Sequence, residues 1–250
     1  MMHMTHAQRC ILLLLFAASA CQAPASTPPV TEALMPSPLP SSTSVPSPSP
    51  LPPTATATLA PAARSFTEDF DRGAPYWIFL QAAAGSEALD AEATGGSLRL
   101  TLSAPNQWAY AVYDAHAYAD VRVDARVEFG AGGQGAAGLI CRYDPAAGWY
   151  EFNIHADRTY TLLLGQWLAE GVARYTPLVI ASSEEIGPTV NEIGLGCEGD
   201  ILTPYINGVQ IRRRQETLHV LHEGKIGISA ASLESAPLSI SVDWVGVGEP

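Results

Sequence analysis

The sequence predicts an all-β fold, a sandwich or barrel of short antiparallel strands. The clearest strand is Val121–Phe129, in which every odd-numbered residue is apolar and every even-numbered one is charged. Such alternation is typical of a strand with one buried face. Asn207-Gly208 lies between two extended runs and predicts a hairpin turn, because both central positions of that turn need a positive φ. No stretch of the folded part has a competing helical period.

The strands follow one another along the chain, separated by Gly, Asp, Asn and Pro. Each is supported by alternation or by a short apolar run between such turn residues. The predicted strands are Ser97–Leu102, Ala109–Tyr113, Val121–Phe129, Gly138–Tyr143, Trp149–His155, Tyr160–Leu164, Glu192–Glu198, Ile201–Ile206, Val209–Arg213, Lys225–Ala230 and Leu238–Val247.

The chain begins with a targeting segment, residues 1–20. Arg9 precedes the apolar run Ile11–Ala18, which is too short for a transmembrane helix of about 20 residues. The small residues Ala18-Ser19-Ala20 lead directly into Cys21 and resemble a bacterial lipobox. The resemblance implies lipidation of Cys21 and a lipid-anchored, extracytoplasmic location at the cell membrane. The alternative is an ordinary secretory signal peptide that contains a cysteine.

Residues 21–63 are predicted to form a disordered stalk. Twelve of the 20 prolines lie between residues 22 and 63, and Glu32 is the single charge there. Such a composition buries too little apolar surface to offset the entropy of ordering. About 40 residues in an extended polyproline conformation reach on the order of 120 Å. Residues 64–250 then form one folded domain, held away from the membrane.

The folded domain is acidic, with 12 basic and 24 acidic residues once Arg9 and Glu32 are set aside. Nucleic-acid binding needs a basic face, so a nucleic-acid partner is not expected. The run Arg212–Arg214 is the one basic cluster in the sequence, and we interpret it as a solvated strand end.

Several short segments, taken in order, resemble the concanavalin A-like lectin/glucanase superfamily, especially its laminin-G-like and keto-glycoside-hydrolase-like branches. The resemblance covers residues 66–248 and implies a jelly-roll sandwich of two antiparallel sheets, one of them concave and often the ligand face. The segments that carry it are Phe66–Phe70, Trp77, Gly96–Leu100, Gly138–Tyr143, Tyr150–Phe152, Tyr205–Gly208, Gly224–Ile228 and Val242–Val245.

Two further features concern stabilisation of the domain. Cys141 and Cys197 lie at apolar-facing strand positions, and export makes a disulfide between them the favoured prediction over two buried thiols.

The resemblance also implies a structural calcium ion near the C-terminal strand, where Asp243 matches the acidic position. Asp69 or Asp71 would supply further oxygen ligands of the kind calcium prefers. Solvated aspartates are the alternative.

The strand Trp149–His155 offers the best candidate ligand platform. Trp149, Glu151, Asn153 and His155 share one face, and the other face looks like core. An aromatic ring stacks on a sugar, while carboxylate and amide groups bind its hydroxyls. Arg142 and Trp167 are expected to extend this platform from neighbouring strands or loops. The alternative is that Trp149 caps a hairpin tip.

Catalytic residues are not apparent. Glycoside hydrolysis needs two carboxylates flanking the sugar, and the Glu-x-Asp-x-x-Glu pattern of related glucanases does not occur. The favoured prediction is therefore a lipoprotein with a non-catalytic module that binds carbohydrate or a cell-envelope polymer. A glycoside hydrolase and a protein-interaction or structural envelope module are the alternatives, because this fold hosts all three.

Overall fold

The structure is a computed structural model that describes residues 63–83, 89–130 and 134–250. The predicted signal peptide, the lipidation site at Cys21 and nearly all of the stalk lie outside these residues. Within them the chain contains strands and no helix. Accordingly, the described part contains no helix that is long and apolar enough to cross a membrane.

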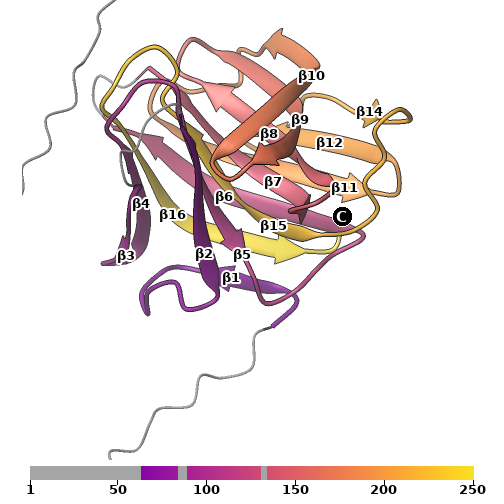
Figure 1. Ribbon diagram of the computed structural model, residues 1–250, viewed down its shortest axis with the longest axis horizontal. Helices are drawn as coiled ribbons and strands as arrows, with labels where there is room; N and C mark the ends of the chain where they lie inside the picture. Colours follow the sequence, from indigo (N-terminus) through magenta and orange to yellow (C-terminus); the bar gives the residue numbers. More distant parts are fainter. Residues whose placement is uncertain (1–62, 84–88, 131–133) are drawn as a thin grey trace, which may run out of the picture. The chain divides into compact units, whose positions relative to one another are not determined.

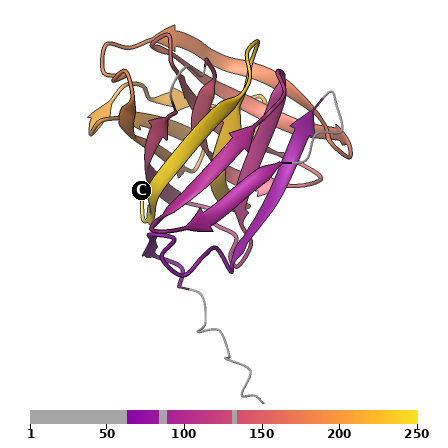
Figure 2. The same ribbon diagram turned by 90° about the vertical axis from the view of Figure 1, so that its left-hand side faces the viewer.

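The fold is a sandwich of two antiparallel sheets (Figures 1 and 2). The nine-stranded sheet has β6 near its middle, between β11 and β16, and the yellow C-terminal strand β16 crosses beside the purple N-terminal strands in Figure 2. β1 pairs with the end of β16, and β14 pairs with β12. In spatial order its strands are β13 (Val209–Gln210), β12 (Ile201–Ile206), β11 (Val190–Glu198), β6 (Val121–Phe129), β16 (Leu238–Gly248), β4 (Ser97–Leu102) and β3 (Asp90–Thr94), with β1 (Phe66–Glu68) and β14 (Arg214–Gln215) at the side.

The seven-stranded sheet ends in two strands that expose an edge, β10 and β2. In spatial order its strands are β10 (Val172–Ser182), β9 (Thr159–Ala169), β8 (Gly148–His155), β7 (Ala136–Asp144), β15 (Lys225–Ala231), β5 (Gln107–Tyr113) and β2 (Trp77–Ala83).

The main core lies between the two sheets. The odd-numbered residues of β6 are all buried, as the alternation predicts, and they pack against Tyr150, Phe152 and Ile154 of β8 in the same core. Cys141 of β7 and Cys197 of β11 form a disulfide that joins the two sheets through this core. The predicted all-β sandwich and the predicted disulfide are therefore confirmed.

The predicted strands recur with small shifts, apart from Val209–Arg213, which forms only the two-residue strand β13 before the chain leaves the sheet. Asn207 and Gly208 before it have φ values of 48° and 81°, as the predicted turn requires. Five strands were not predicted: β1, β2, β3, β10 and β14. β10 contains Pro177, which is tolerated because an edge strand needs hydrogen bonds on one side only.

Candidate functional site

The outer face of the seven-stranded sheet carries a second apolar cluster, separate from the main core. Tyr110, Val112, Ile140, Tyr143 and Trp149 are buried there. β5 explains why: Trp108, Tyr110 and Val112 point to this outer face, while Ala109, Ala111 and Tyr113 point to the main core. A strand that is apolar on both faces is buried on both faces.

Glu151 lies inside this cluster and is fully buried. Its carboxylate accepts hydrogen bonds from Trp149 Nε1 at 2.9 Å, Asn153 Nδ2 at 2.9 Å and the Tyr110 hydroxyl at 3.4 Å. Burial raises the pKa of Glu151, although these donors favour the charged form and offset part of the shift. The Tyr110 and Tyr175 hydroxyls are 2.5 Å apart.

The β9–β10 hairpin covers this network. It leaves the sheet edge and folds back over the face, as the orange ribbon in Figure 1 shows, and it reaches as far as β2. Gly165 of β9 makes the close approach possible, since a Cβ there would lie 2.2 Å from Trp149 Cε2. Tyr175 of β10 stacks on Trp108 with a centroid distance of 5.4 Å. The hairpin therefore seals the centre of the outer face.

Two pockets open beside the tip of the hairpin, and both include Gly171 in their lining. The larger has a volume of about 550 Å³ and lies between β2, the β7–β8 turn and the tip. The smaller, of about 310 Å³, lies on the β10 side and is lined by residues that include Trp108 and Tyr175. The lining residues of the larger pocket are Phe79, Leu80, Gln81, Tyr143, Pro145, Trp167, Ala169, Glu170 and Gly171.

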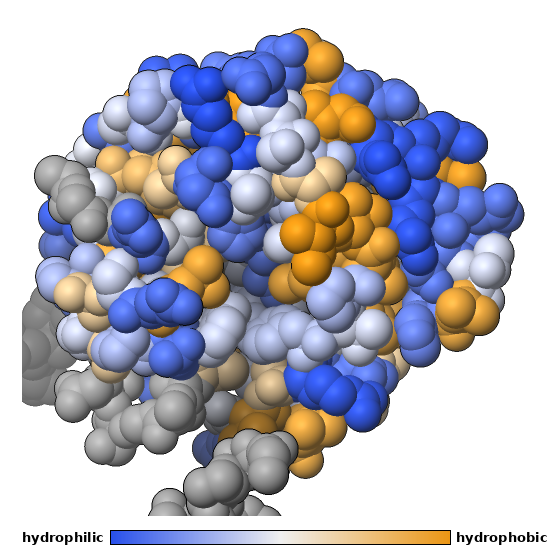
Figure 3. All heavy atoms as spheres, turned by 90° about the horizontal axis from the view of Figure 1, so that it is seen from above, coloured by the Kyte–Doolittle hydropathy of each residue, from blue (hydrophilic) through white to orange (hydrophobic). Residues whose placement is uncertain are grey.

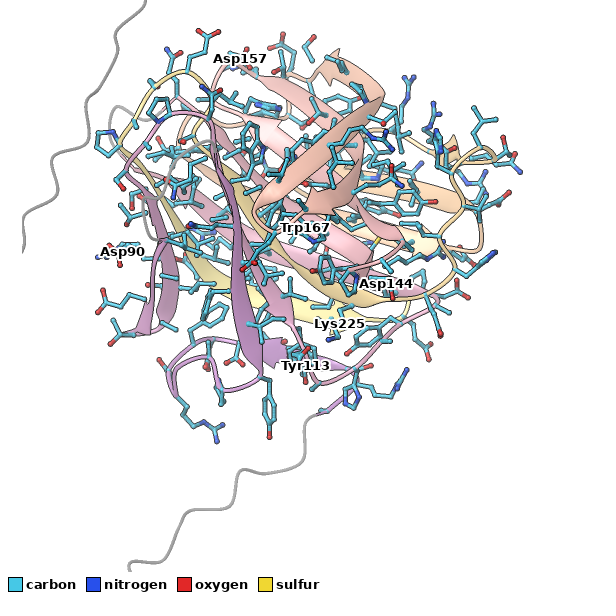
Figure 4. All side chains as sticks on the ribbon, viewed as in Figure 1. Asp90, Tyr113, Asp144, Asp157, Trp167 and Lys225 are labelled. Atoms are coloured by element: carbon cyan, nitrogen blue, oxygen red, sulfur yellow. A yellow bond between two sulfur atoms is a disulfide. The ribbon has the colours of Figure 1, made fainter. Side chains whose placement is uncertain are left out.

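Trp167 of β9, labelled in Figure 4, forms an aromatic wall of the larger pocket. Its indole Nε1 donates to the Tyr143 hydroxyl at 3.1 Å, and its ring lies 5.1 Å from that of Trp149. These contacts hold the ring in one orientation while the side chain stays partly exposed. Phe79, on the opposite side, is 38% exposed.

Seen from above, the molecule presents a mainly hydrophilic surface on which apolar residues gather in separate patches (Figure 3). Exposed apolar side chains of the described residues include Leu168, Val172 and Ile180 of the hairpin and Ile78 and Phe79 of β2. Part of the exposed apolar surface thus lies on the hairpin and the edge strand that bound the larger pocket, and the rest, at Val209, Leu218 and Val220, lies elsewhere.

The predicted platform on β8 is on the expected face but is not open. Trp149 and Glu151 are 0% exposed and Asn153 is 2% exposed, because the hairpin covers all three. His155, at the end of the strand, is partly exposed, and burial lowers its pKa. These side chains form a buried polar network rather than the exposed ligand platform that was expected.

Arg142 is also a structural residue, contrary to the expectation that it extends the platform. Its guanidinium is 1% exposed and donates to the backbone carbonyls of Ala119, Gly199 and Leu221. It thereby ties together three loops at one end of the sandwich. Of the predicted ligand residues, Trp167 lines the larger pocket beside the hairpin, and His155 lines a smaller pocket of about 150 Å³ at the other end of β8.

Two of the three aspartates predicted to bind calcium have hydrogen-bond partners for their carboxylates. Asp243 accepts a hydrogen bond from Arg126 Nε at 3.0 Å, and Asp69 accepts one from the backbone N–H of Asp71. Within the described residues no group of three or more His, Cys, Asp or Glu side chains is arranged to hold a metal ion. The calcium site implied by the resemblance stays a prediction.

Phe79, Tyr143 and Tyr175 were missed by the sequence analysis. Tyr143 lies at the end of a predicted strand, but nothing in its neighbourhood shows that a distant hairpin brings Trp167 onto it. Simple alternation with Ile240 and Val242 would place Trp244 in the core. A β-bulge between Val242 and Trp244 shifts the register, so both Asp243 and Trp244 point outward.

No protein-family model and no curated protein matches the sequence. Solved structures do match the fold. A protein of unknown function with a galectin-like fold from Bacillus subtilis aligns with a TM-score of 0.54 at 13% identity, covering 74% of this chain and 94% of that one. The Bacillus licheniformis β-glucanase aligns with a TM-score of 0.52 at 13% identity, covering 75% and 99%.

A family 16 glycoside hydrolase of Bacteroides ovatus, solved with a mixed-linkage glucan product, also aligns, with a TM-score of 0.52 at 11% identity and coverage of 73% and 99%. The fold that the resemblance implies is thus confirmed: the domain is a jelly-roll sandwich of two antiparallel sheets. At these identities the likeness concerns the fold alone.

Proposed function

We propose that this chain is a non-catalytic carbohydrate-binding module, and that the larger pocket beside the β9–β10 hairpin is its ligand site. The observation that carries the proposal is Trp167, a partly exposed ring fixed by Tyr143 and Trp149 in the wall of a pocket of about 550 Å³. Small-ligand sites are of this size, with apolar and aromatic walls and few polar groups. A pyranose stacks on such a ring without reordering it.

The carboxylates argue for binding rather than hydrolysis. Among the described residues that line the larger pocket, Glu170 is the one carboxylate. Glycoside hydrolysis needs a pair about 5 to 10 Å apart on either side of the scissile bond. Glu151 is fully buried under the hairpin. A sugar in this pocket therefore meets no acid–base pair.

The test is a glycan-array assay with the intact chain, comparing wild type with Trp167→Ala and Trp167→Phe. Loss of the ring removes the stacking surface, so Trp167→Ala is expected to weaken binding at least about tenfold, which corresponds to about 1.4 kcal/mol. Trp167→Phe keeps a ring and is expected to retain part of the affinity.

Two further variants separate loss of the site from loss of the hairpin. Phe79→Ser changes the opposite wall of the pocket at a residue of β2 and leaves the sequence of the hairpin unchanged. This variant is also expected to weaken binding. Leu218→Ala, at a side chain that is 81% exposed and outside the pocket, is the matched control and is expected to bind normally. The proposal fails if no glycan binds, or if Trp167→Ala and Phe79→Ser bind as well as wild type.

The location of the module is proposed from the sequence. We propose that lipidation at Cys21 and the stalk of residues 21–63 display it outside the cell membrane. The supporting features are the apolar run Ile11–Ala18, the small residues before Cys21 and the proline content that follows. Labelling with radioactive palmitate tests this: wild type is expected to incorporate it, and equal incorporation by Cys21→Ser would refute the anchor.

A further inference from the structure

The outer face of the nine-stranded sheet has a groove of its own, on the side of the sandwich opposite the hairpin. Its volume is about 310 Å³. It runs over β16, β6, β11 and β12, with Trp244 at one end and Tyr205 at the other. The two rings stand on strands that are separated by β6 and β11.

The register explains how the groove forms. Gly246, Asp124, Gly194 and Tyr205 are successive partners across β16, β6, β11 and β12, so they form one row on the outer face. The Asp124 carboxylate lies over Gly194, where a Cβ would be 2.4 Å from Oδ1, and the Trp244 ring lies beside Gly246. Glycine inside a strand weakens it and often marks a place where another molecule approaches closely. The walls of the groove are formed by the side chains of its other lining residues.

Trp244 is aimed into the groove by the β-bulge between Val242 and Trp244. Bulges of this kind are frequent next to functional sites, where they redirect a side chain. Without it, the alternation of β16 would turn this indole into the core. Its ring is partly exposed and lies beside Gly246, where a Cβ would be 3.6 Å from Cζ3.

Polar side chains along the groove are held in fixed positions. Arg122 Nε donates to both oxygens of Asp124, at 3.1 and 2.9 Å, and its guanidinium lies 4.0 Å from the centroid of Tyr205. Arg126 pairs with Glu192 at 3.5 Å and with Asp243 at 3.0 Å. All of these side chains keep a third to a half of their surface exposed, so they retain hydrogen-bonding capacity towards a ligand.

The geometry points to a second ligand site in this groove, one that binds a neutral pyranose ring stacked on Trp244. Guanidinium groups donate to sugar hydroxyls and carboxylates accept from them. The groove is lined by the carboxylates of Asp124 and Glu192 and by one guanidinium group, that of Arg122, and the neighbouring Arg126–Asp243 pair adds no net charge. The resulting excess of negative charge disfavours uronic and sialic acids. The inference shares only its ligand class with the proposed function, because the two sites lie on opposite sheets. A module with both sites would bridge two glycan chains and gain avidity on a dense polymer.

The test blocks the groove without unfolding the sheet. Gly246 has ordinary backbone geometry, and its added Cβ would make only van der Waals contact. Gly246→Val places a β-branched side chain, which strands favour, in the groove. Gly248→Val is the matched control: it makes the same change two residues along β16, where nothing lies within 4 Å and the residue does not line the groove.

The intact chain and its variants are probed on an array of neutral glucans, mannans, galactans and mucin O-glycans, with uronate and sialylated glycans in parallel. The inference expects at least one neutral glycan whose binding falls about tenfold or more in Trp244→Ala and Gly246→Val. The same glycan is expected to bind normally to Gly248→Val and to recover in part in Trp244→Phe. Its binding is also expected to persist in Trp167→Ala.

The variants distinguish failure of the groove as a ligand site from failure of the larger pocket as a ligand site. If every bound glycan is lost in Trp167→Ala and none in Trp244→Ala, the groove is not a site and the proposed function stands. If glycans respond to Trp244→Ala and not to Trp167→Ala, the groove is a site and the pocket is not. Silence of the whole array, preferential binding of acidic glycans, or equal loss in Gly246→Val and Gly248→Val would overturn the inference.

Discussion

At the scale of single residues, Glu151 is a buried carboxyl group surrounded by neutral donors. Burial raises its pKa above the ordinary value of 4.5. A carboxyl group with a raised pKa in the folded state contributes stability that is fully present below pH 4.5. That stability is lost as the pH rises through the folded-state pKa, because the folded protein must then hold a buried charge.

Glu151→Gln removes this titration while keeping the shape of the side chain. Asn153 can turn its amide so that its oxygen accepts from the new Gln and its nitrogen donates to Ser229, whose hydroxyl lies 2.9 Å away. We expect the variant to gain stability relative to wild type as the pH rises from 4.5, by about 1.4 kcal/mol for each unit of pKa shift. Urea unfolding at pH 4.5, 6 and 8 measures this difference, and a difference that does not change with pH would contradict it.

Residue identities in this network were predictable from the sequence, but their exposure was not. Alternation places Trp149, Glu151 and Asn153 on one face of β8, and the structure agrees. Alternation describes a strand and its two faces, however, and carries no information about a segment that folds over one of them. The buried state of Glu151 depends on Gly165 and Tyr175, whose contacts with β8 and β5 are not local in sequence.

At the scale of elements, the β9–β10 hairpin decides what the outer face can bind. The sequence predicted only Tyr160–Leu164 of it. Pro177 and the register shift between Pro177 and Val179 interrupt any alternation in β10, so the returning strand has no period-two signal. Edge strands tolerate such irregularity because one side of their backbone faces solvent. The larger pocket was therefore not predictable, although Trp167 in its wall was among the expected ligand residues.

Gly165→Ala tests how the hairpin is seated. The new methyl group would lie 2.2 Å from Trp149 Cε2, and the ring can move only by lifting the hairpin or disturbing Glu151. Overpacking of this kind costs about 1 to 3 kcal/mol. We expect lower stability in urea together with a red-shifted tryptophan emission, because water reaches Trp149.

Gly171→Ala is the control for this prediction. Gly171 has a φ of 69° with nothing within 4 Å of an added Cβ, so alanine there costs about 1 to 2 kcal/mol of backbone strain without a clash. Its tryptophan emission is expected to match that of wild type. An unshifted emission in Gly165→Ala would mean that the hairpin does not seal Trp149.

At the scale of the whole molecule, the sandwich follows from features that the sequence displays directly. Every second residue of β6 is buried, and Asn207-Gly208 makes the expected turn. Trp244 departs from this rule because one extra residue in β16 reverses the faces beyond the bulge. A bulge leaves no distinct pattern in the sequence, so the groove beside Trp244 becomes visible only once the register is known.

The disulfide between Cys141 and Cys197 is the covalent link between the two sheets, and its removal tests how far they hold together by packing alone. It closes a loop with a sequence separation of 56 residues, which corresponds to about 4 kcal/mol in the chain-entropy model. We expect the double variant Cys141→Ala/Cys197→Ala to unfold at lower urea concentration, with a free energy of unfolding reduced by up to this amount. Adding a reducing agent should weaken wild type in the same direction and leave the double variant unchanged. A loss below about 1 kcal/mol would show that the inner faces of β7 and β11 already hold the sheets in register, with the bond adding little to their packing.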